Sequence, residues 1–142
     1  MFVLNNSEGR YTAKCIVNHK KARIRDFVVD TGAKYTCCSY DYVDSSLDEK
    51  DFSDAKTKTL GGFVANVGMK FYEIELKQFT IGTVDFGKQK IWITFDERIA
   101  DSLLGMDILS QAVFANTPDR GQFAVYDDVK EAVEDLSAYL SA

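Results

Sequence analysis

The sequence predicts a mostly β protein that folds as a single domain over residues 1–142. Apolar-rich segments of strand length alternate with turn residues at short intervals, a spacing typical of all-β chains. Only two segments have a helical pattern, and with no internal repeat and one proline, nothing indicates a linker. The 142 residues, 46% of them hydrophobic, are enough to bury a core.

The first predicted elements form a hairpin. Tyr11–Asn18 alternates between apolar and polar residues, which favours a strand. Asn18–Ala22 is predicted to be the turn, and Arg23–Val29 the returning strand. The next stretch, Val43–Lys58, is charged and rich in Ser and Asp, so we expect a loop or a short irregular helix there.

The second half contains further strands and both helices. Four apolar-rich segments, punctuated by glycines, are predicted to be strands: Phe63–Val67, Met69–Leu76, Phe79–Ile81 and Ile91–Phe95. A short helix is expected to start near Asp107, where an acidic residue can cap it. A second helix is expected over Asp127–Leu140, where four apolar residues recur at helical spacing: Val129, Val133, Leu136 and Leu140.

Charge and cysteine content exclude several classes of partner. A net charge of -5 leaves no basic excess for binding nucleic acid. No apolar stretch is long enough to span a membrane, and the first residues lack a signal-peptide pattern. The chain has three cysteines, Cys15, Cys37 and Cys38, and an odd number with two adjacent does not suggest a disulfide framework. Their spacing, with one histidine in the chain, does not match a metal site either. We therefore expect no metal, no cofactor, no membrane partner and a reducing, cytoplasmic setting.

One carboxylate stands out by its context. Asp30 follows the apolar run Phe27–Val29, so it is expected at the mouth of the core rather than on a solvated face. Gly32 then allows a sharp turn or the close approach of another chain. Asp-Thr-Gly alone is a weak signal, because an ordinary aspartate at the end of a strand has the same neighbours.

Two motifs in order make the sequence similar to the retropepsin-like, or retroviral-type, aspartic peptidases. The family has two apolar residues before Asp-Thr-Gly-Ala or Asp-Thr-Gly-Ser, which matches residues 28–33. Downstream it has two apolar residues and a Gly entering a short helix, which matches Leu103-Leu104-Gly105 and the residues after it. Lys58–Phe63 lies where the family has its flap, a Gly-bearing hairpin that closes over the substrate. The resemblance covers about residues 10–118.

The resemblance implies a particular fold. We expect a closed acid-protease-type β-barrel, equivalent to half of a pepsin-like enzyme, with a short helix after the Leu-Leu-Gly motif. The peptidase core would span about 10–118, and a C-terminal strand and an additional helix would occupy 119–142.

The resemblance also implies a function, an aspartic endopeptidase acting on a peptide or protein substrate. Because the chain has one Asp-Thr-Gly and no room for a second lobe, activity implies a homodimer in which each subunit brings one aspartate. The residues carried over have four roles: Asp30 is catalytic, Thr31, Gly32 and Ala33 form the active-site loop, Gly61 and Gly62 bind substrate from the flap, and Leu103, Leu104 and Gly105 support the site.

Some positions depart from the viral pattern. Lys34 stands where viral enzymes often carry an acid that pairs with an arginine, and Met106 stands where that arginine would be. Both partners are replaced together, which favours a different dimer-stabilising network over a broken one. The C-terminal helix is additional, so the viral terminal interface need not be retained.

Two other interpretations stay open. The fold could serve as a catalytically silent dimerisation or peptide-binding module, with the Asp-Thr-Gly loop kept as a structural knot. The intact Asp, Thr and Gly argue against this, because a silent module does not need a paired carboxylate. The chain could also be an unrelated small β-barrel, in which case the two motifs are coincidence.

Overall fold

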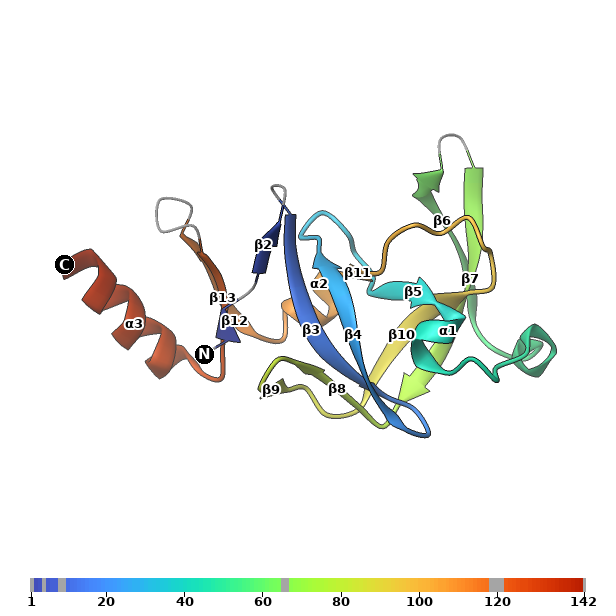
Figure 1. Cartoon of the computed structure of the whole chain (residues 1–142), viewed down its shortest axis with the longest axis horizontal. Coiled ribbons are helices and arrows are strands. Elements are labelled where there is room, and N and C mark those ends of the chain that lie inside the picture. Colours follow the sequence, from blue (N-terminus) through green and yellow to red (C-terminus); the bar gives the residue numbers. More distant parts are fainter. Residues whose placement is uncertain (1, 4, 8–9, 65–66, 118–121, 142) are drawn as a thin grey trace.

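The computed structural model describes residues 2–3, 5–7, 10–64, 67–117 and 122–141. Strands dominate this part of the chain, as the sequence predicts, and the helices are short except for the last (Figure 1). In chain order the elements are β1 (Phe2–Val3), β2 (Asn5–Ser7), β3 (Arg10–Asn18), β4 (Ala22–Val29), β5 (Cys37–Ser39), α1 (Tyr40–Val43), the 3-10 helix η1 (Glu49–Phe52), β6 (Thr57–Val64), β7 (Val67–Leu76), β8 (Gln78–Ile81), β9 (Val84–Asp85), β10 (Gln89–Thr94), β11 (Leu103–Leu104), α2 (Met106–Leu109), β12 (Val113–Thr117), β13 (Gln122–Tyr126) and α3 (Val129–Ser141).

Most described strands belong to one sheet. Its order is β6-β7-β10-β5-β11-β4-β3-β8-β9, with β2 paired to β3 beside this path. The predicted hairpin is confirmed: β3 and β4 pair antiparallel from Thr12 opposite Val28 to Asn18 opposite Ala22. In the middle of the sheet, the short strand β11 lies between β4 and β5, parallel to β4 and antiparallel to β5.

The predicted closed barrel is not confirmed. In the described part of the chain β6 pairs only with β7, and β9 pairs only with β8, so the sheet keeps two free ends. The β6–β7 hairpin projects beyond the rest of the molecule, whereas β8 and β9 turn back beside β3 (Figure 1). The two end ribbons therefore diverge, and hydrogen bonds between strands do not complete a ring.

The core lies inside this sheet. Alternate residues of β3 (Ala13, Cys15 and Val17) are buried, as expected for a strand with one inward face. Phe27 of β4 is fully buried and meets Phe79 edge-on, with ring centroids 5.6 Å apart. Burying each large apolar side chain of this kind contributes roughly 1.5–3 kcal/mol to folding. The strand that leads to Asp30 is therefore anchored in the core.

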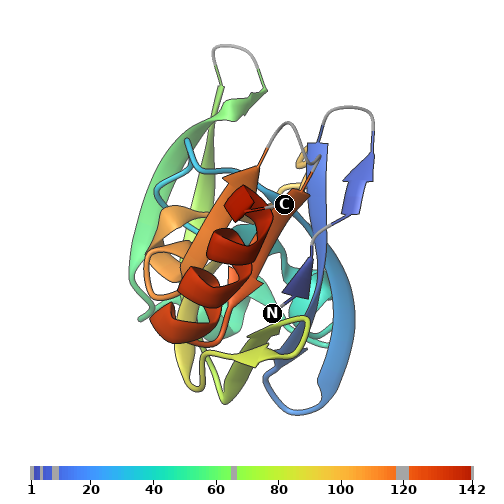
Figure 2. The same cartoon turned by 90° about the vertical axis from the view of Figure 1, so that its left-hand side faces the viewer.

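A second, smaller sheet carries both terminal regions. Its order is β1-β13-β12, so a strand at the start of the chain pairs with one near its end. Val125 of β13 packs into the main core, whereas its neighbours Ala124 and Tyr126 pack against Ala132 of α3. The Tyr126 hydroxyl donates to an Asp135 carboxylate oxygen at 2.6 Å. The small sheet is thus sandwiched between the main core and α3, which lies in front of it in Figure 2.

The apolar residues that indicated the last helix are not the ones that α3 buries. Val129, Val133 and Leu140 are 64%, 56% and 81% exposed, and Ala132 instead is buried against the sheet. Helical spacing therefore identified the element, but among its described side chains the buried one is the small Ala132, while Leu136 is half-buried.

Other expectations of the sequence fall on irregular or undescribed segments. Val43–Lys58 contains the end of α1, η1 and turns, and β6 already begins at Thr57. Residues 65–66 of the predicted Phe63–Val67 strand, and 118–121 around the predicted end of the core, lie outside the described residues. None of the helices in the described ranges combines the length and the apolar character needed to cross a membrane.

Candidate active site

Asp30 lies where β4 leaves the core. The Val28 amide donates to the Ser102 carbonyl at 2.8 Å, and the Asp30 amide donates to the Leu104 carbonyl at 3.0 Å. These bonds extend the parallel pairing of β11 with β4 up to the aspartate itself. The position of Asp30 is therefore fixed by backbone bonds, and its side chain is left for other contacts.

The turn after Asp30 is tight and depends on a glycine. The Ala33 amide donates to the Asp30 carbonyl at 3.1 Å, and the Gly32 amide donates to the Asp30 carboxylate at 2.9 Å. A Cβ atom on Gly32 would lie 3.2 Å from that same carboxylate oxygen. Gly32 thus lets the backbone amide approach the carboxylate closely, while Thr31 beside it is exposed.

The Leu-Leu-Gly segment supports this loop from below. Leu103 and Leu104 form β11, and Gly105 packs directly on the backbone after the loop. A Cβ atom on Gly105 would lie 2.6 Å from the Tyr35 carbonyl carbon and oxygen, so only glycine fits. The Met106 amide then donates to the Ala33 carbonyl at 2.8 Å, which ties the start of α2 to the loop.

A buried polar knot joins the two motifs, and the sequence analysis missed it. The fully buried Thr36 donates to Asp107 from its amide at 3.0 Å and from its hydroxyl at 2.7 Å. The Thr36 hydroxyl in turn accepts the Gly105 amide at 3.0 Å. The residue at the N-cap position of α2 is Gly105, so Asp107 is not the cap residue that we expected. A lone threonine in an otherwise apolar segment was the only sequence signal of this knot.

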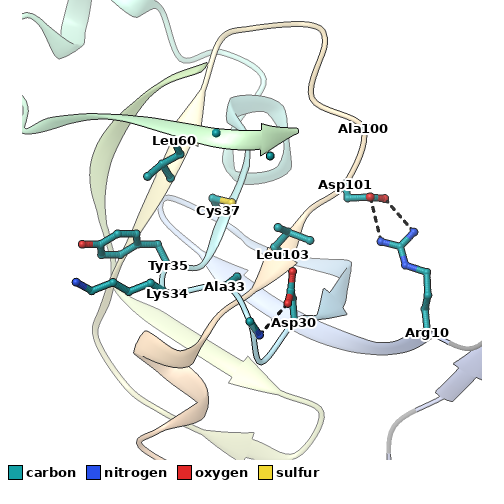
Figure 3. A pocket seen from close by; sticks show the side chains of 13 residues that line it. Arg10, Asp30, Ala33, Lys34, Tyr35, Cys37, Leu60, Ala100, Asp101 and Leu103 are labelled. Atoms are coloured by element: carbon teal, nitrogen blue, oxygen red, sulfur yellow. Dashed lines mark hydrogen bonds and ion pairs between the residues drawn. The ribbon is translucent and has the colours of Figure 1, made fainter. Parts of the chain in front are cut away.

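A pocket of about 470 Å³ opens at the Asp30 loop. Six of the predicted site residues line it: Asp30, Gly32, Ala33, Gly61, Gly62 and Leu103. Thr31, Leu104 and Gly105 do not line it. In Figure 3 the Asp30 side chain points into the space beneath β6, and Leu60 points into that space from β6.

The glycines of β6 lie at an irregular part of the hairpin. The pairing of β6 with β7 shifts register between Leu60 and Val64. Gly62 within this shift has φ +96°, a conformation that favours glycine, and both Gly61 and Gly62 have open space where a Cβ would be. The backbone of β6 is therefore accessible from the pocket at this point.

Two further features of the pocket came from the structure. Arg10 and Asp101 form an ion pair at its edge, with Arg10 Nη2 3.0 Å from an Asp101 oxygen (Figure 3). Cys37 also lines the pocket, but burial raises the pKa of its thiol to about 12. The thiol is thus protonated at neutral pH and is not a nucleophile. Within the described residues, no cluster of three or more His, Cys, Asp or Glu side chains could hold a metal ion.

Comparison with known proteins places this geometry in context. Residues 13–111 match the model of a family described as gag-polyprotein putative aspartyl protease. Comparison with curated proteins gave no significant match. A solved structure, a retropepsin-like aspartic protease from Rickettsia conorii, is similar with a TM-score of 0.63 at 22% identity, over 87% of this chain and 86% of that one. The EIAV protease complexed with the inhibitor HBY-793 is similar with a TM-score of 0.51 at 16% identity, over 75% of this chain and 91% of that one.

Proposed function

This chain belongs to the family of gag-polyprotein putative aspartyl proteases, and from that premise we propose that it is an aspartic endopeptidase that acts as a homodimer. The observation that carries the proposal is the set of contacts around the Asp30 carboxylate. Among the described residues this carboxylate receives one hydrogen bond, from the Gly32 amide, and it borders a pocket of about 470 Å³. A carboxylate held in place by its backbone but open on the pocket side suits acid–base chemistry.

The pocket itself supports the need for a second subunit. An aspartic peptidase uses two carboxylates, one as base and one as acid. The other carboxylate that lines the pocket, among the described residues, belongs to Asp101, and Arg10 engages it at 3.0 Å. A second copy of Asp30, brought by a two-fold axis beside the loop, supplies the missing group.

The chemistry then follows from two facing carboxylates that share one proton. The ionised Asp30 takes a proton from a water, whose oxygen adds to the carbonyl carbon of the peptide bond. The protonated Asp30 of the other subunit donates its proton to the carbonyl oxygen. The Asp30 that took the proton from water then passes it to the nitrogen of the gem-diol, the other Asp30 takes a proton from one of its hydroxyls, and the C–N bond breaks to leave a carboxylic acid and an amine.

The remaining site residues have positioning roles in this proposal. The exposed Thr31 hydrogen-bonds to the loop of the other subunit, and Gly32 and Ala33 shape the turn. Gly61 and Gly62 contact the substrate backbone, so an extended peptide is held between the flap and the loop as an added strand. Leu103, Leu104 and Gly105 hold the loop in register. The three buried free thiols suit a reducing, cytoplasmic setting.

The test is cleavage of a diverse peptide library between pH 4 and 7. We expect cleavage by the native chain and a loss of at least about a hundredfold in kcat/KM for Asp30→Asn, because the amide cannot take a proton from water. Sedimentation at several concentrations should show a dimer.

Asp26→Asn is the matched control. Asp26 lies on β4, the strand that leads to Asp30, but its exposed side chain pairs with Lys14 at 3.2 Å and does not line the pocket. This variant should cleave like the native chain. A folded dimer that binds peptides without cleaving any of them would instead make the chain a silent binding module, and a strict monomer would contradict the proposal.

A further inference from the structure

A second hollow lies beside the Asp30 pocket. It measures about 490 Å³ and is lined by Tyr35, Lys56, Thr57, Lys58, Glu73, Trp92 and Asp107; we call it the Tyr35 hollow. Tyr35 also lines the Asp30 pocket, so the two spaces meet at this ring. A chain that extends from Asp30 towards the base of β6 passes Tyr35 and reaches the hollow.

Two lysines from distant segments converge on the Tyr35 ring. Lys34 follows the Asp30 loop, and its Nζ lies 5.4 Å from the ring centroid. Lys58 comes from β6, and its Nζ lies 5.0 Å from the same centroid and 5.5 Å from that of Trp92. In Figure 3 Lys34 and Tyr35 run side by side and point away from Asp30. Ammonium groups at these distances are attracted to the ring faces, which holds them near the hollow.

The charges of these lysines are not neutralised. No ion pair between described residues includes Lys34, Lys56 or Lys58. Two carboxylates face the hollow, and both have other partners.

Glu73 lies 3.9 Å from the Lys90 ammonium, and Asp107 accepts hydrogen bonds from Thr36. A hydrogen bond with Lys58, and the positive charges of Lys34 and Lys58, lower the pKa of the Tyr35 phenol against a smaller opposing effect of desolvation. Four lysines, Lys34, Lys56, Lys58 and Lys90, lie in or beside the hollow against the two carboxylates, so its surroundings keep a net positive charge.

We propose that the Tyr35 hollow is a substrate-binding site that selects an acidic side chain, Asp or Glu, in the peptide. The inference rests on the proposed peptidase function and names its substrate class. A carboxylate beside Tyr35, where the pocket and the hollow meet, lies near Lys34 on the pocket side and Lys58 in the hollow, while the aromatic faces of Tyr35 and Trp92 cover its methylene groups. In the homodimer the hollow occurs once on each side of the scissile bond, so an acidic residue on either side is favoured.

The physical scale of this preference is modest and depends on salt. Each exposed ion pair changes binding by roughly 1.4- to fivefold, so two lysines correspond to roughly a two- to thirtyfold preference over a neutral residue, and we expect about five- to tenfold. A lysine in the peptide is disfavoured by repulsion at the same place. Because the pairs are exposed, the preference should shrink as the ionic strength rises.

The experiment compares matched peptides that carry Glu, Gln or Lys at each position around one cleaved bond. We expect kcat/KM of the native chain to be about five- to tenfold higher for Glu than for Gln at one or more positions in low salt. The double variant Lys34→Gln, Lys58→Gln should reduce that ratio to about twofold or less, chiefly by lowering kcat/KM for the Glu peptides.

Lys70→Gln is the matched control. Lys70 lies on the same hairpin, with its Nζ 5.1 Å from the centroid of another tyrosine ring, Tyr72, but it does not line the hollow. It should keep the full preference for Glu. Equal cleavage of Glu and Gln peptides by the native chain, or a preference that survives in the double variant, would overturn the inference.

A binding assay separates this inference from the peptidase proposal. Fluorescent Glu and Gln peptides are titrated against Asp30→Asn, with and without the two lysine substitutions. If the native chain cleaves nothing, tighter binding of Glu peptides that disappears with the lysine substitutions supports the hollow and contradicts catalysis. If Glu and Gln peptides bind equally tightly, the proposal that the hollow selects an acidic side chain is overturned as well.

Discussion

Asp30 lies at the start of the loop that leads to Thr36, and Asp107 contacts Thr36 at its other end, yet the two carboxylates have opposite surroundings. Asp107 accepts the Thr36 amide and hydroxyl and the Ile108 amide, at 2.7–3.0 Å, around a threonine with no exposed surface. Asp30 accepts the Gly32 amide at 2.9 Å and otherwise faces the pocket. A carboxylate that accepts several buried donors holds structure together even where, like Asp107, it also borders a hollow, whereas one with fewer donors beside a pocket is available for chemistry.

The largest expected effect on stability is that of Asp107→Ala. The substitution leaves the buried Thr36 amide and hydroxyl without their acceptor. Because each unsatisfied buried donor costs about 1–3 kcal/mol, the free energy of unfolding should fall by about 2–4 kcal/mol. Asp30→Asn should not lower it, although it abolishes cleavage. Urea unfolding at a fixed protein concentration measures the free energy of unfolding of both variants. The dependence of that free energy on urea concentration should be the same as in the native chain.

Asp48→Ala provides the control for losing a carboxylate acceptor at the surface. Asp48 accepts the Lys50 amide at 3.1 Å as the cap of η1, in an exposed position. Its loss should cost about 1 kcal/mol. If Asp30→Asn cost as much as Asp107→Ala, the distinction between an open and a saturated carboxylate would be wrong.

The next effect on stability concerns two glycines, Gly105, which packs against the backbone after the Asp30 loop, and Gly61 of β6, which lines the pocket. A Cβ at Gly105 would come within 2.6 Å of the Tyr35 backbone, whereas one at Gly61 meets nothing within 4 Å. Gly105→Ala should therefore destabilise by about 1–3 kcal/mol, because backbone must move. Gly61→Ala should change stability by no more than about 0.5 kcal/mol. Thermal unfolding of both variants checks this, and equal shifts would contradict it.

Some parts of the fold around the site could be predicted from short stretches of sequence. The β3–β4 hairpin and the turn at Gly32 each depend on a few adjacent residues whose types indicate their role, whereas the Leu-Leu-Gly segment was found through the family resemblance. Gly32 was predicted from its place after Asp30 and Gly105 from the family motif, and the structure supplies the reason for each glycine in a close contact that a Cβ would disturb.

Long-range partners could not be predicted in this way. Thr36 meets Asp107 across 71 residues, and Arg10 meets Asp101 across 91, and neither pair follows a periodic pattern. The β1–β13 pairing has the same origin, since a two-residue strand carries no signal of its own. The Tyr35 hollow likewise assembles only when β6, β10 and the Asp30 loop come together. Such contacts follow from the packing of the whole sheet and not from any one segment.

The smallest expected effect tests whether a carboxylate that accepts several hydrogen bonds at the surface also stabilises the fold. Asp96 also accepts several donors, the Arg98 amide at 3.0 Å and its guanidinium at 2.6 Å, but at the surface. The Arg98 hydrogen bonds lower the pKa of Asp96 from 3.8 to about 2. Because the pKa of Asp96 is lowered in the folded state, the stabilising effect of its carboxylate is complete above about pH 4 and is lost as the pH falls towards 2.

Asp96→Asn should lower the melting temperature by only about a degree at pH 6 in low salt, and by less in high salt. The difference from the native chain should vanish near pH 2. A shift as large as that of Asp107→Ala would mean that the number of hydrogen bonds, and not the burial of their donors, decides which carboxylates stabilise the fold.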